Sequence, residues 1–378
     1  MSRIEKFFAT CPRGLEAILA EELEGLEAQQ VKAERGGVRF QGSMAVCYRA
    51  NLRSRIAGRV LLQVAKGKYQ DETDLYQQAS ALPWQQWFAV EQSFKIRVTA
   101  INCPLKSINF AALKVKDAVC DAFRSQTGRR PNVDLQAPDV TLHLFLNRRE
   151  FTLYADTSGE ALFKRGYRQR DVEAPLRENL AAGILMLAGW RPGIPLLDPM
   201  CGSGTFLAEA AMMALEMAPG LGRGFAFQQL AGFDQAAWEA ELRVASDAEQ
   251  ASCLLPIYGR DRDRRAMEAS TINLKGLGVL DCIHLEQQEA TSGAAPAAEG
   301  MIVTNPPYGE RLSDRKALAT LYGQWGEQLR TQFGGWSAWI LSGDEGLPQG
   351  LGLRPSREVK LYNGALAVTL YRFDIHRR

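Results

Sequence analysis

The sequence of 378 residues predicts an α/β protein whose second half is a doubly wound sheet and whose first half consists of smaller α+β units. The main observation is a short apolar strand, a glycine-rich turn and a helix in succession over residues 195–217, which is how such sheets begin. A second observation is Asn363-Gly364 between two apolar segments, the strongest short signal for a β-hairpin. The doubly wound sheet is therefore expected to end in an antiparallel hairpin.

The composition excludes several classes of protein. Hydrophobic residues make up 46% and charged residues 23% of the chain, as in ordinary globular proteins. There is no run of about 18 apolar residues that would span a membrane, and residues 1–6 lack the apolar core of a secretory signal. The cysteines are scattered and the histidines share no spacing, so we expect no disulfides and no metal site. These features favour a cytoplasmic protein.

Positive charge is concentrated in the middle of the chain. Residues 95–170 contain 14 Lys and Arg against 7 Asp and Glu, whereas residues 171–378 contain 19 against 25. A basic cluster on a neutral or acidic background is typical of proteins that bind a polyanion. An ordinary solvated surface is the alternative interpretation.

The first unit is expected at residues 1–60. It begins with a strand at 4–9, followed by a helix at 14–26 with one apolar face. A glycine turn leads to a strand at 38–40, and a second helix follows to about Arg55.

The second unit is expected at residues 61–157. Apolar residues alternate with Lys and Arg over 94–100, so one face of that strand is buried and the other is basic. The helix at 107–124 is amphipathic, and its expected buried residues are Ile108, Ala111, Val115, Val119 and Phe123. The other expected elements are a strand at 61–64, a helix at 74–87 broken by Pro83, and paired strands at 140–146 and 151–154.

The third unit is expected at residues 158–378, beginning with a basic linker at 159–170. Its strands are predicted at 195–197, 254–259, 283–285, 301–303 and 337–341, with the final hairpin at 359–373. Its helices are predicted at 175–190, at 206–217, from 265 onward, and at 316–332.

The glycine-rich turn is predicted to bind a cofactor. Gly202 and Gly204 allow close approach of a ligand to the backbone, and the helix that follows offers free N–H groups. The turn lacks both the Gly-Lys-Ser/Thr ending of a phosphate loop and the third glycine of a dinucleotide fingerprint. It therefore fits a nucleoside without a polyphosphate, with Asp198 facing a cationic amino-acid part. The cofactor candidates here are Asp198, Pro199, Met200, Cys201, Gly202, Ser203, Gly204 and Thr205.

Acidic residues follow the next two strands. An acid at the end of the second strand is where such sheets bind ribose hydroxyls. Asp261 is our choice, and Asp263 is the competitor, although Asp263 is equally suited to cap the next helix. Glu289, after the third strand, is placed to meet an adenine amine, and a solvated loop carboxylate is the alternative.

The fourth strand leads into Asn305-Pro306-Pro307-Tyr308. The prolines end the strand because they have no backbone N–H and a restricted φ. The Asn305 amide and the Pro306 carbonyl can accept the two hydrogens of an exocyclic amine, while the Tyr308 ring stacks on a planar base. An isolated Asn-Pro-Pro is equally compatible with a surface turn, so the other motifs decide between the two interpretations.

The three motifs, in this order, resemble those of class I S-adenosylmethionine-dependent amino-methyltransferases, whose fold is Rossmann-like, over roughly residues 160–378. The order of elements before them resembles a ferredoxin-like unit followed by an RNA-binding THUMP domain. Asn-Pro-Pro-Tyr-Gly-Glu-Arg at 305–311, with the segments at 217–220 and 225–227, resembles the large-subunit rRNA guanine-N2 methyltransferases. In some bacteria that unit is fused to a second methyltransferase, which we do not expect in this chain.

This resemblance implies a function and a set of sites. The cofactor is S-adenosylmethionine, no metal takes part, and the product is N2-methylguanosine in 23S rRNA. A flipped guanine is held by the catalytic candidates Asn305, Pro306, Pro307 and Tyr308, and Asn305 also borders the cofactor. The residues expected to contact RNA are Lys106, Lys114, Lys116, Arg148, Arg149, Lys164, Arg165 and Arg168.

Three alternatives remain open. The first is a guanine-N2 methyltransferase that acts on tRNA. The second is an adenine-N6 methyltransferase of DNA, since Asn-Pro-Pro-Tyr serves that amine as well. The third is a non-catalytic RNA-binding assembly factor that has kept the fold.

Overall fold

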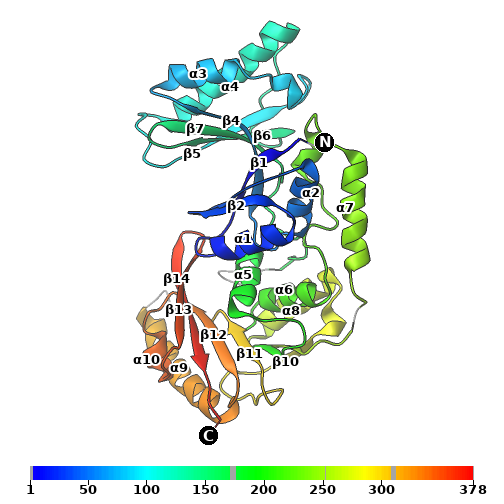
Figure 1. The fold of residues 1–378 in the computed structure, drawn as a ribbon. Helices are drawn as coiled ribbons and strands as arrows, with labels where there is room; N and C mark the ends of the chain where they lie inside the picture. The colour runs from blue at the N-terminus through cyan, green and yellow to red at the C-terminus, as the bar shows by residue number, and fades with distance from the viewer. Residues whose placement is uncertain (1–2, 171–175, 252, 308–311, 378) are drawn as a thin grey trace.

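The computed structural model describes residues 3–170, 176–251, 253–307 and 312–377, with the backbone alone for 312–317. The described strands form two seven-stranded sheets, one in each half of the chain (Figure 1). The order in the N-terminal sheet is β2-β3-β1-β4-β7-β6-β5, and that in the C-terminal sheet is β10-β9-β8-β11-β12-β14-β13.

The N-terminal sheet contains both of the predicted α+β units. Its strands are β1 (Glu5–Thr10), β2 (Gln29–Glu34), β3 (Gly37–Gly42), β4 (Arg59–Lys68), β5 (Phe94–Ala100), β6 (Val140–Leu146) and β7 (Glu150–Asp156). Its helices are α1 (Glu16–Gly25), α2 (Met44–Arg53), α3 (Glu72–Ser80) and α4 (Ile108–Thr127), with a short turn of helix, η1 (Trp84–Gln86).

The two units share strand β4. Its first half pairs with β1, as in Phe7 opposite Leu62, and its length from Leu61 to Lys68 pairs with β7. A register shift between Gln63 and Ala65 bends the strand between these two roles. β4 thus runs through positions 60 and 61, where the sequence places a domain boundary, and the division into domains stays a prediction.

The C-terminal sheet is doubly wound with an antiparallel end, as predicted. Its strands are β8 (Leu196–Asp198), β9 (Ile257–Asp261), β10 (His284–Gln287), β11 (Met301–Thr304), β12 (Ser337–Ser342), β13 (Arg357–Asn363) and β14 (Leu366–Asp374). Its helices are α5 (Glu178–Ala188), α6 (Thr205–Ala214), α7 (Gln235–Ala248), α8 (Arg264–Leu277), α9 (Leu312–Gln332) and α10 (Leu347–Leu351). The remaining short helical turns are η2 (Ala226–Gln229) and η3 (Leu280–Cys282).

Both faces of this sheet are covered. On β12, Ala338 and Ile340 belong to the core that contains α9 and α10, while Trp339 and Leu341 belong to the core that contains α5 and α6. Such alternation is required when helices cover both faces of a sheet. No helix in the described ranges is long and apolar enough to cross a bilayer.

The structure corrects several local predictions. Ile108, expected in the core, is 37% exposed, because it begins the first turn of α4, where Phe110 and Leu113 are exposed as well. Elements β2, α7 and α10 were not predicted. The turn of the final hairpin lies one residue later than predicted, since Asn363 pairs with Leu366 and leaves Gly364 and Ala365 as the loop.

The hairpin extends beyond the carboxyl end of the parallel strands. Ser342, the last residue of β12, pairs with Thr369, so residues 366–368 and their partners on β13 continue past it. Three residues of strand add about 10 Å. The hairpin tip therefore reaches from the carboxyl edge of the sheet toward the N-terminal half (Figure 1).

Candidate functional site

The carboxyl ends of β8 and β11 bring two predicted motifs together. The strands are paired in parallel, with Leu197 opposite Ile302. At their ends the Thr304 hydroxyl donates a hydrogen bond of 2.7 Å to Oδ1 of Asp198. Asp198 opens the glycine-rich turn and Asn305 follows Thr304 directly, so the predicted cofactor loop and amine-binding loop start side by side.

Asp198 is a buried carboxyl group without a cationic partner among the described residues. Among the described residues it accepts hydrogen bonds from Thr304 and from the backbone N–H of Met200, at 3.2 Å. Burial, with a smaller contribution from the neighbouring Asp261, raises the pKa of Asp198 to about 7. A bound cation would compensate this charge, since opposite charge favours the ionised form.

The glycine-rich turn has a backbone that only glycine adopts readily. Gly202 and Gly204 have φ of 55° and 81°. A Cβ at Gly204 would lie 3.1 Å from Oγ of Ser270, a buried residue of α8 that donates a hydrogen bond of 2.7 Å to the Gly202 carbonyl. Sequence reasoning missed Ser270, because no motif marks a serine in the middle of a helix.

Asp261 and Asp263 have different roles in the structure. Asp263 caps α8 by accepting a hydrogen bond from the backbone N–H of Arg265, at 2.8 Å. Asp261 lies at the end of β9 and accepts a hydrogen bond from the N–H of Gly202, at 3.0 Å. Of the two, Asp261 is the one that contacts the glycine-rich turn.

The other cofactor candidates differ in exposure. Burial raises the pKa of the Cys201 thiol well above its usual value, so Cys201 stays protonated. The side chains of Ser203 and Thr205 are also buried, whereas Pro199 and Met200 lie in the same turn and Met200 is partly exposed.

Glu289 is exposed in the loop after β10. The loop starts next to Asp261, because the N–H of Gln288 donates a hydrogen bond of 3.0 Å to the Asp261 carbonyl. Glu289 therefore follows the strand that neighbours β9 in the sheet, in the same order as the motifs follow one another in the sequence.

The basic linker is bound to the glycine-rich turn. Buried Asn273 of α8 accepts hydrogen bonds from the N–H groups of Gln169 and Arg170, at 2.8 and 3.0 Å. Its amide nitrogen donates to the carbonyls of Arg170, at 2.8 Å, and Ser203, at 3.1 Å. One asparagine side chain therefore connects the linker, α8 and the turn.

Two of the residues predicted to contact RNA, Arg165 and Arg168, instead pair with carboxylates of the protein itself, which corrects the prediction. The side chain of Arg165 is 1% exposed and pairs with Glu209, which is fully buried, at 3.4 Å. Arg168 pairs with Glu178 at 2.8 Å and donates a hydrogen bond of 3.1 Å to the Thr205 hydroxyl. Their charge suggested a surface position, but Glu209 of α6 pairs with Arg165, which is buried, and Glu178 of α5 pairs with Arg168, which is partly buried.

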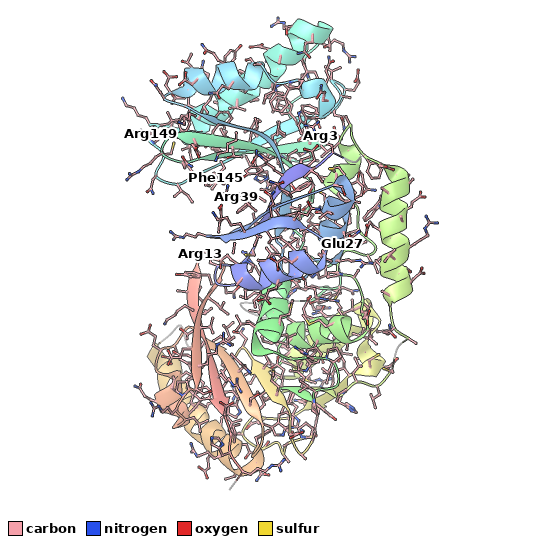
Figure 2. The ribbon with its side chains drawn as sticks, viewed as in Figure 1. Arg3, Arg13, Glu27, Arg39, Phe145 and Arg149 are labelled. Carbon is pink, nitrogen blue, oxygen red and sulfur yellow. The ribbon has the colours of Figure 1, made fainter. Side chains whose placement is uncertain are left out.

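The remaining basic candidates are at the surface. Lys106, Arg148 and Arg149 are exposed, and Arg149 points outward at the edge of the N-terminal sheet (Figure 2).

Three lysines are already in contact with neighbouring side chains. The Lys114 ammonium lies 5.4 Å from the centre of the Phe110 ring, and Lys116 pairs with Asp117 at 2.7 Å. Lys164 is exposed and pairs with Glu160 at 2.8 Å.

The loop at 305–307, predicted to bind an amine, is anchored by a residue that the sequence did not reveal. Asn305 is partly buried, Pro306 is buried and Pro307 is exposed. The hydroxyl of Tyr322 on α9 donates a hydrogen bond of 3.0 Å to the Pro307 carbonyl. Burial raises the pKa of Tyr322 to about 12, which keeps it a donor. Tyr308 lies outside the described residues.

Known proteins resemble this chain along its whole length. The profile described as "RMKL-like, methyltransferase domain" matches residues 165–372, that of the THUMP domain 69–156, and that of the RlmL ferredoxin-like domain 6–61. A Synechocystis sp. protein named as an RNA methyltransferase is 40% identical over 98% of this chain and 97% of its own length.

A longer relative and a solved structure complete the comparison. The ribosomal RNA large subunit methyltransferase K/L of Syntrophotalea carbinolica is 42% identical over 98% of this chain, which spans only 53% of that protein. The crystal structure of a methyltransferase, SMU.472, complexed with SAH has a TM-score of 0.91, with 32% identity and all of each chain covered.

Proposed function

The chain belongs to the RMKL-like methyltransferase family, and from this premise we propose that it forms N2-methylguanosine in large-subunit ribosomal RNA. S-adenosylmethionine is the methyl donor. The observation that carries the proposal is the hydrogen bond between Thr304 and Asp198, at 2.7 Å. It joins the start of the glycine-rich turn to the start of the amine-binding loop, so that donor and acceptor of the methyl group have neighbouring sites.

The donor would be held by the glycine-rich turn and the acids around it. Asp198 would face the ammonium group of its amino-acid part, which supplies the positive charge that this buried carboxylate lacks. Asp261 would accept hydrogen bonds from the ribose hydroxyls, and Glu289 would accept one from the adenine amine. The donor supplies an electrophilic methyl group on a sulfonium.

The amine-binding loop would hold the target base. The guanine leaves its stack and enters the site, and the Tyr308 ring covers one face. The side chain of Asn305 and the carbonyl of Pro306 accept the two amine hydrogens and direct the nitrogen lone pair at the methyl carbon. The C–S bond breaks as the N–C bond forms, and the amine then loses a proton to solvent.

Positioning would supply most of the rate acceleration. Tyr322 contributes because it fixes the Pro307 carbonyl and so limits the loop to one conformation. A guanine amine is barely basic and loses its proton only after transfer, so we name no general base.

Two features support RNA as the substrate. The THUMP match includes residues 95–156 of the basic middle of the chain, and both curated relatives are named for action on RNA. The name of the longer relative favours large-subunit rRNA over tRNA.

The test is a nucleoside mass analysis with labelled S-adenosylmethionine. The protein is incubated with protein-free 23S rRNA, bulk tRNA and DNA from a strain that lacks the enzyme. We expect N2-methylguanosine in rRNA, lost with Asn305→Ala and kept with Gln349→Ala, which removes an exposed amide on α10.

The other outcomes each correct the proposal. Label in tRNA would keep the chemistry and change the substrate, and methyladenine in DNA would replace both. If no nucleic acid is labelled while the protein binds the donor, catalysis on these RNAs is excluded.

A further inference from the structure

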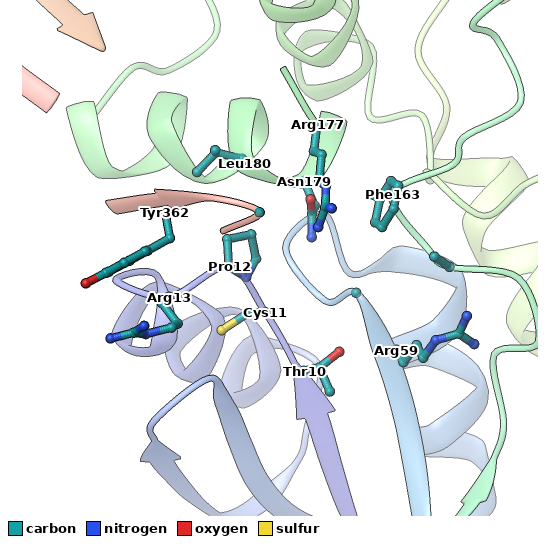
Figure 3. A pocket seen from close by; sticks show the side chains of 13 residues that line it. Thr10, Cys11, Pro12, Arg13, Arg59, Phe163, Arg177, Asn179, Leu180 and Tyr362 are labelled. Atoms are coloured by element: carbon teal, nitrogen blue, oxygen red, sulfur yellow. The ribbon is translucent and has the colours of Figure 1, made fainter. Parts of the chain in front are cut away.

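A cavity of about 230 Å³ lies where the N-terminal sheet, the linker and the methyltransferase domain meet. It is lined by the loop after β1, the start of the linker, the first turn of α5 and the tip of the final hairpin (Figure 3). The residues that matter here are Arg13, Arg59, Phe163, Arg177, Asn179 and Tyr362.

The cavity lies beyond the carboxyl ends of the parallel strands in the C-terminal sheet, which is also the end where the proposed methyl-transfer site lies. The hairpin passes the end of β12 in the direction in which β8 and β11 end. Its tip contacts the N-terminal half directly, since a Cβ at Gly14 would lie 2.6 Å from the Lys360 carbonyl. A strand of RNA whose base enters the site can therefore run toward the cavity.

Two arginine–aromatic pairs stand on opposite sides of the cavity. The Arg13 guanidinium lies 3.9 Å from the centre of the Tyr362 ring, and the Arg177 guanidinium lies 5.0 Å from that of Phe163 (Figure 3). Stacking on a ring leaves the N–H edge of a guanidinium available for hydrogen bonds. Such stacks also offer flat surfaces for bases.

The charge of these two arginines is not compensated by any described residue. Among the described residues, neither Arg13 nor Arg177 has an ion-pair partner, whereas Arg59 pairs with buried Asp156. Glu178, the carboxylate next to Arg177 in the chain, is neutralised by Arg168 at 2.8 Å. The cavity is thus positive, and the N-terminus of α5 beside it favours an anion as well.

Asn179 adds a requirement for a hydrogen-bond donor. Its amide nitrogen donates to the Ile56 carbonyl at 3.1 Å, which fixes the orientation of the amide, because a carbonyl can only accept. Its Oδ1 is buried with no hydrogen-bond partner among the described residues, and the side chain is almost fully buried. An unpaired buried acceptor is costly, and a hydroxyl or amine of a ligand would satisfy it.

We propose that this cavity binds one nucleotide of the RNA substrate, outside the target position. Its phosphate is neutralised by Arg13 and Arg177, its base stacks on an arginine–aromatic pair, and a hydroxyl or amine donates to Asn179. The inference rests on the proposed action on RNA and adds a site between the two halves of the protein. It also assigns the contact between hairpin and N-terminal half a role in holding substrate.

The test measures RNA binding by the full chain at several salt concentrations. The probe is protein-free 23S rRNA, and the variants are Arg13→Ala, Arg177→Ala and the double variant. Each lost phosphate contact should lower the slope of log affinity against log salt by about 1. We expect the double variant to bind roughly tenfold more weakly, with Arg13→Lys and Arg177→Lys retaining part of the affinity. Arg243→Ala, on the exposed face of α7, is the matched control.

A second measurement locates the contact. Irradiation of a complex with 4-thiouridine-labelled rRNA should link RNA to the peptide that contains Tyr362 or Phe163. Wild-type salt dependence in the double variant, together with no link to either peptide, would overturn the inference. Binding of S-adenosylmethionine by each variant checks that the protein is folded.

The two proposals fail in different ways. If the arginine variants lose affinity but the wild type makes no N2-methylguanosine, the nucleotide site stands and the proposed chemistry is wrong. If the wild type methylates rRNA and the double variant binds and methylates equally well, only the nucleotide site is wrong. If a free mononucleotide inhibits methylation while the arginine variants bind RNA as the wild type does, the cavity binds a small ligand and not the RNA substrate.

Discussion

The N-terminal half contacts the methyltransferase domain at two places. One contact is filled by packed side chains, and the other surrounds a cavity. On one side α2 packs on α7, with the Tyr48 ring centre 4.5 Å from Phe227 and 6.1 Å from Trp238. Arg49 of α2 pairs with Glu241 of α7 at 2.7 Å. On the other side the hairpin tip and the loop after β1 enclose a cavity with two arginines, Arg13 and Arg177, that have no ion-pair partner within the described part of the chain. We call these the closed junction and the open junction.

Unpaired buried polar groups occur near both junctions. Arg165 pairs with Glu209, but side-chain nitrogens of Arg53 and Arg55, at and just after the end of α2, are buried with no hydrogen-bond partner among the described residues. On the ligand-facing side, Asp198 has no cationic partner among the described residues, and Oδ1 of Asn179 has no donor. Unpaired buried groups cost stability, and we propose ligands as the missing partners of Asp198 and Asn179. The closed junction holds the halves together through packed side chains, and the open junction is where we propose that substrate binds.

The largest expected effect is at the closed junction. Trp238→Ala removes a side chain that is 4% exposed and that also packs on Phe227, with ring centres 5.1 Å apart. It should lower the free energy of unfolding by about 3–5 kcal/mol, measured by urea denaturation. Tyr362→Ala at the open junction should change it by less than about 1 kcal/mol. Equal losses for the two variants would remove the distinction between the junctions.

The next effect concerns the buried ion pair. Arg165→Met leaves the Glu209 carboxylate buried without its partner, which should cost about 3 kcal/mol. The control is Lys164→Met, because Lys164 is exposed and its pair with Glu160 contributes about 1 kcal/mol or less. Thermal unfolding of the two variants compares neighbouring cations inside and outside the protein. A stable Arg165→Met variant that binds RNA weakly would restore the original interpretation of Arg165 as an RNA contact.

The smallest effect sharpens the contrast at Asp198. In the free folded protein the pKa of Asp198 is raised to about 7, whereas in the unfolded chain it is about 4. Between these two pH values the folded state keeps a proton that the unfolded state has released. This group therefore contributes stability at low pH that is lost as pH rises through 7. Binding of a cationic ligand requires the ionised form, so affinity for S-adenosylmethionine should rise about tenfold per pH unit below 7 and level off above it.

Calorimetric titrations at pH 6, 7 and 8 provide the measurement. Asp198→Asn should bind weakly and without this pH dependence. A wild-type affinity that is constant over this range would show that Asp198 does not supply the counter-charge.

Sequence reasoning succeeded where a signal is local. Asn305-Pro306-Pro307 and the glycine-rich turn are short motifs with strict backbone requirements, and they lie at adjacent strand ends as the order of motifs implied. The alternating pattern at 94–100 likewise gave β5 with its observed bounds.

It failed where a residue's role is set by distant partners. Arg165 was taken for a surface cation because Glu209, which buries it, lies 44 residues away on another element. Strand β2 was missed because its residues are largely exposed and show no apolar alternation. Tyr322 and Ser270 act through single hydrogen bonds to loops that are remote in sequence. Neither the cavity nor its unpaired acceptor can be predicted from sequence, since five separate segments form the cavity.

Strand β4 also limits how such proteins can exchange parts during evolution. A crossover at position 60 or 61 would divide residues 59–62, which pair with β1, between the two parents, and would take most of the edge that pairs with β7 from the second parent. The chimera would inherit a mismatched strand and an edge prone to aggregation. Recombination that preserves both units must instead fall in the turn between Lys68 and Glu72, after β4 is complete. RNA-binding units can thus be replaced between relatives only if the whole of β4 stays with the first unit.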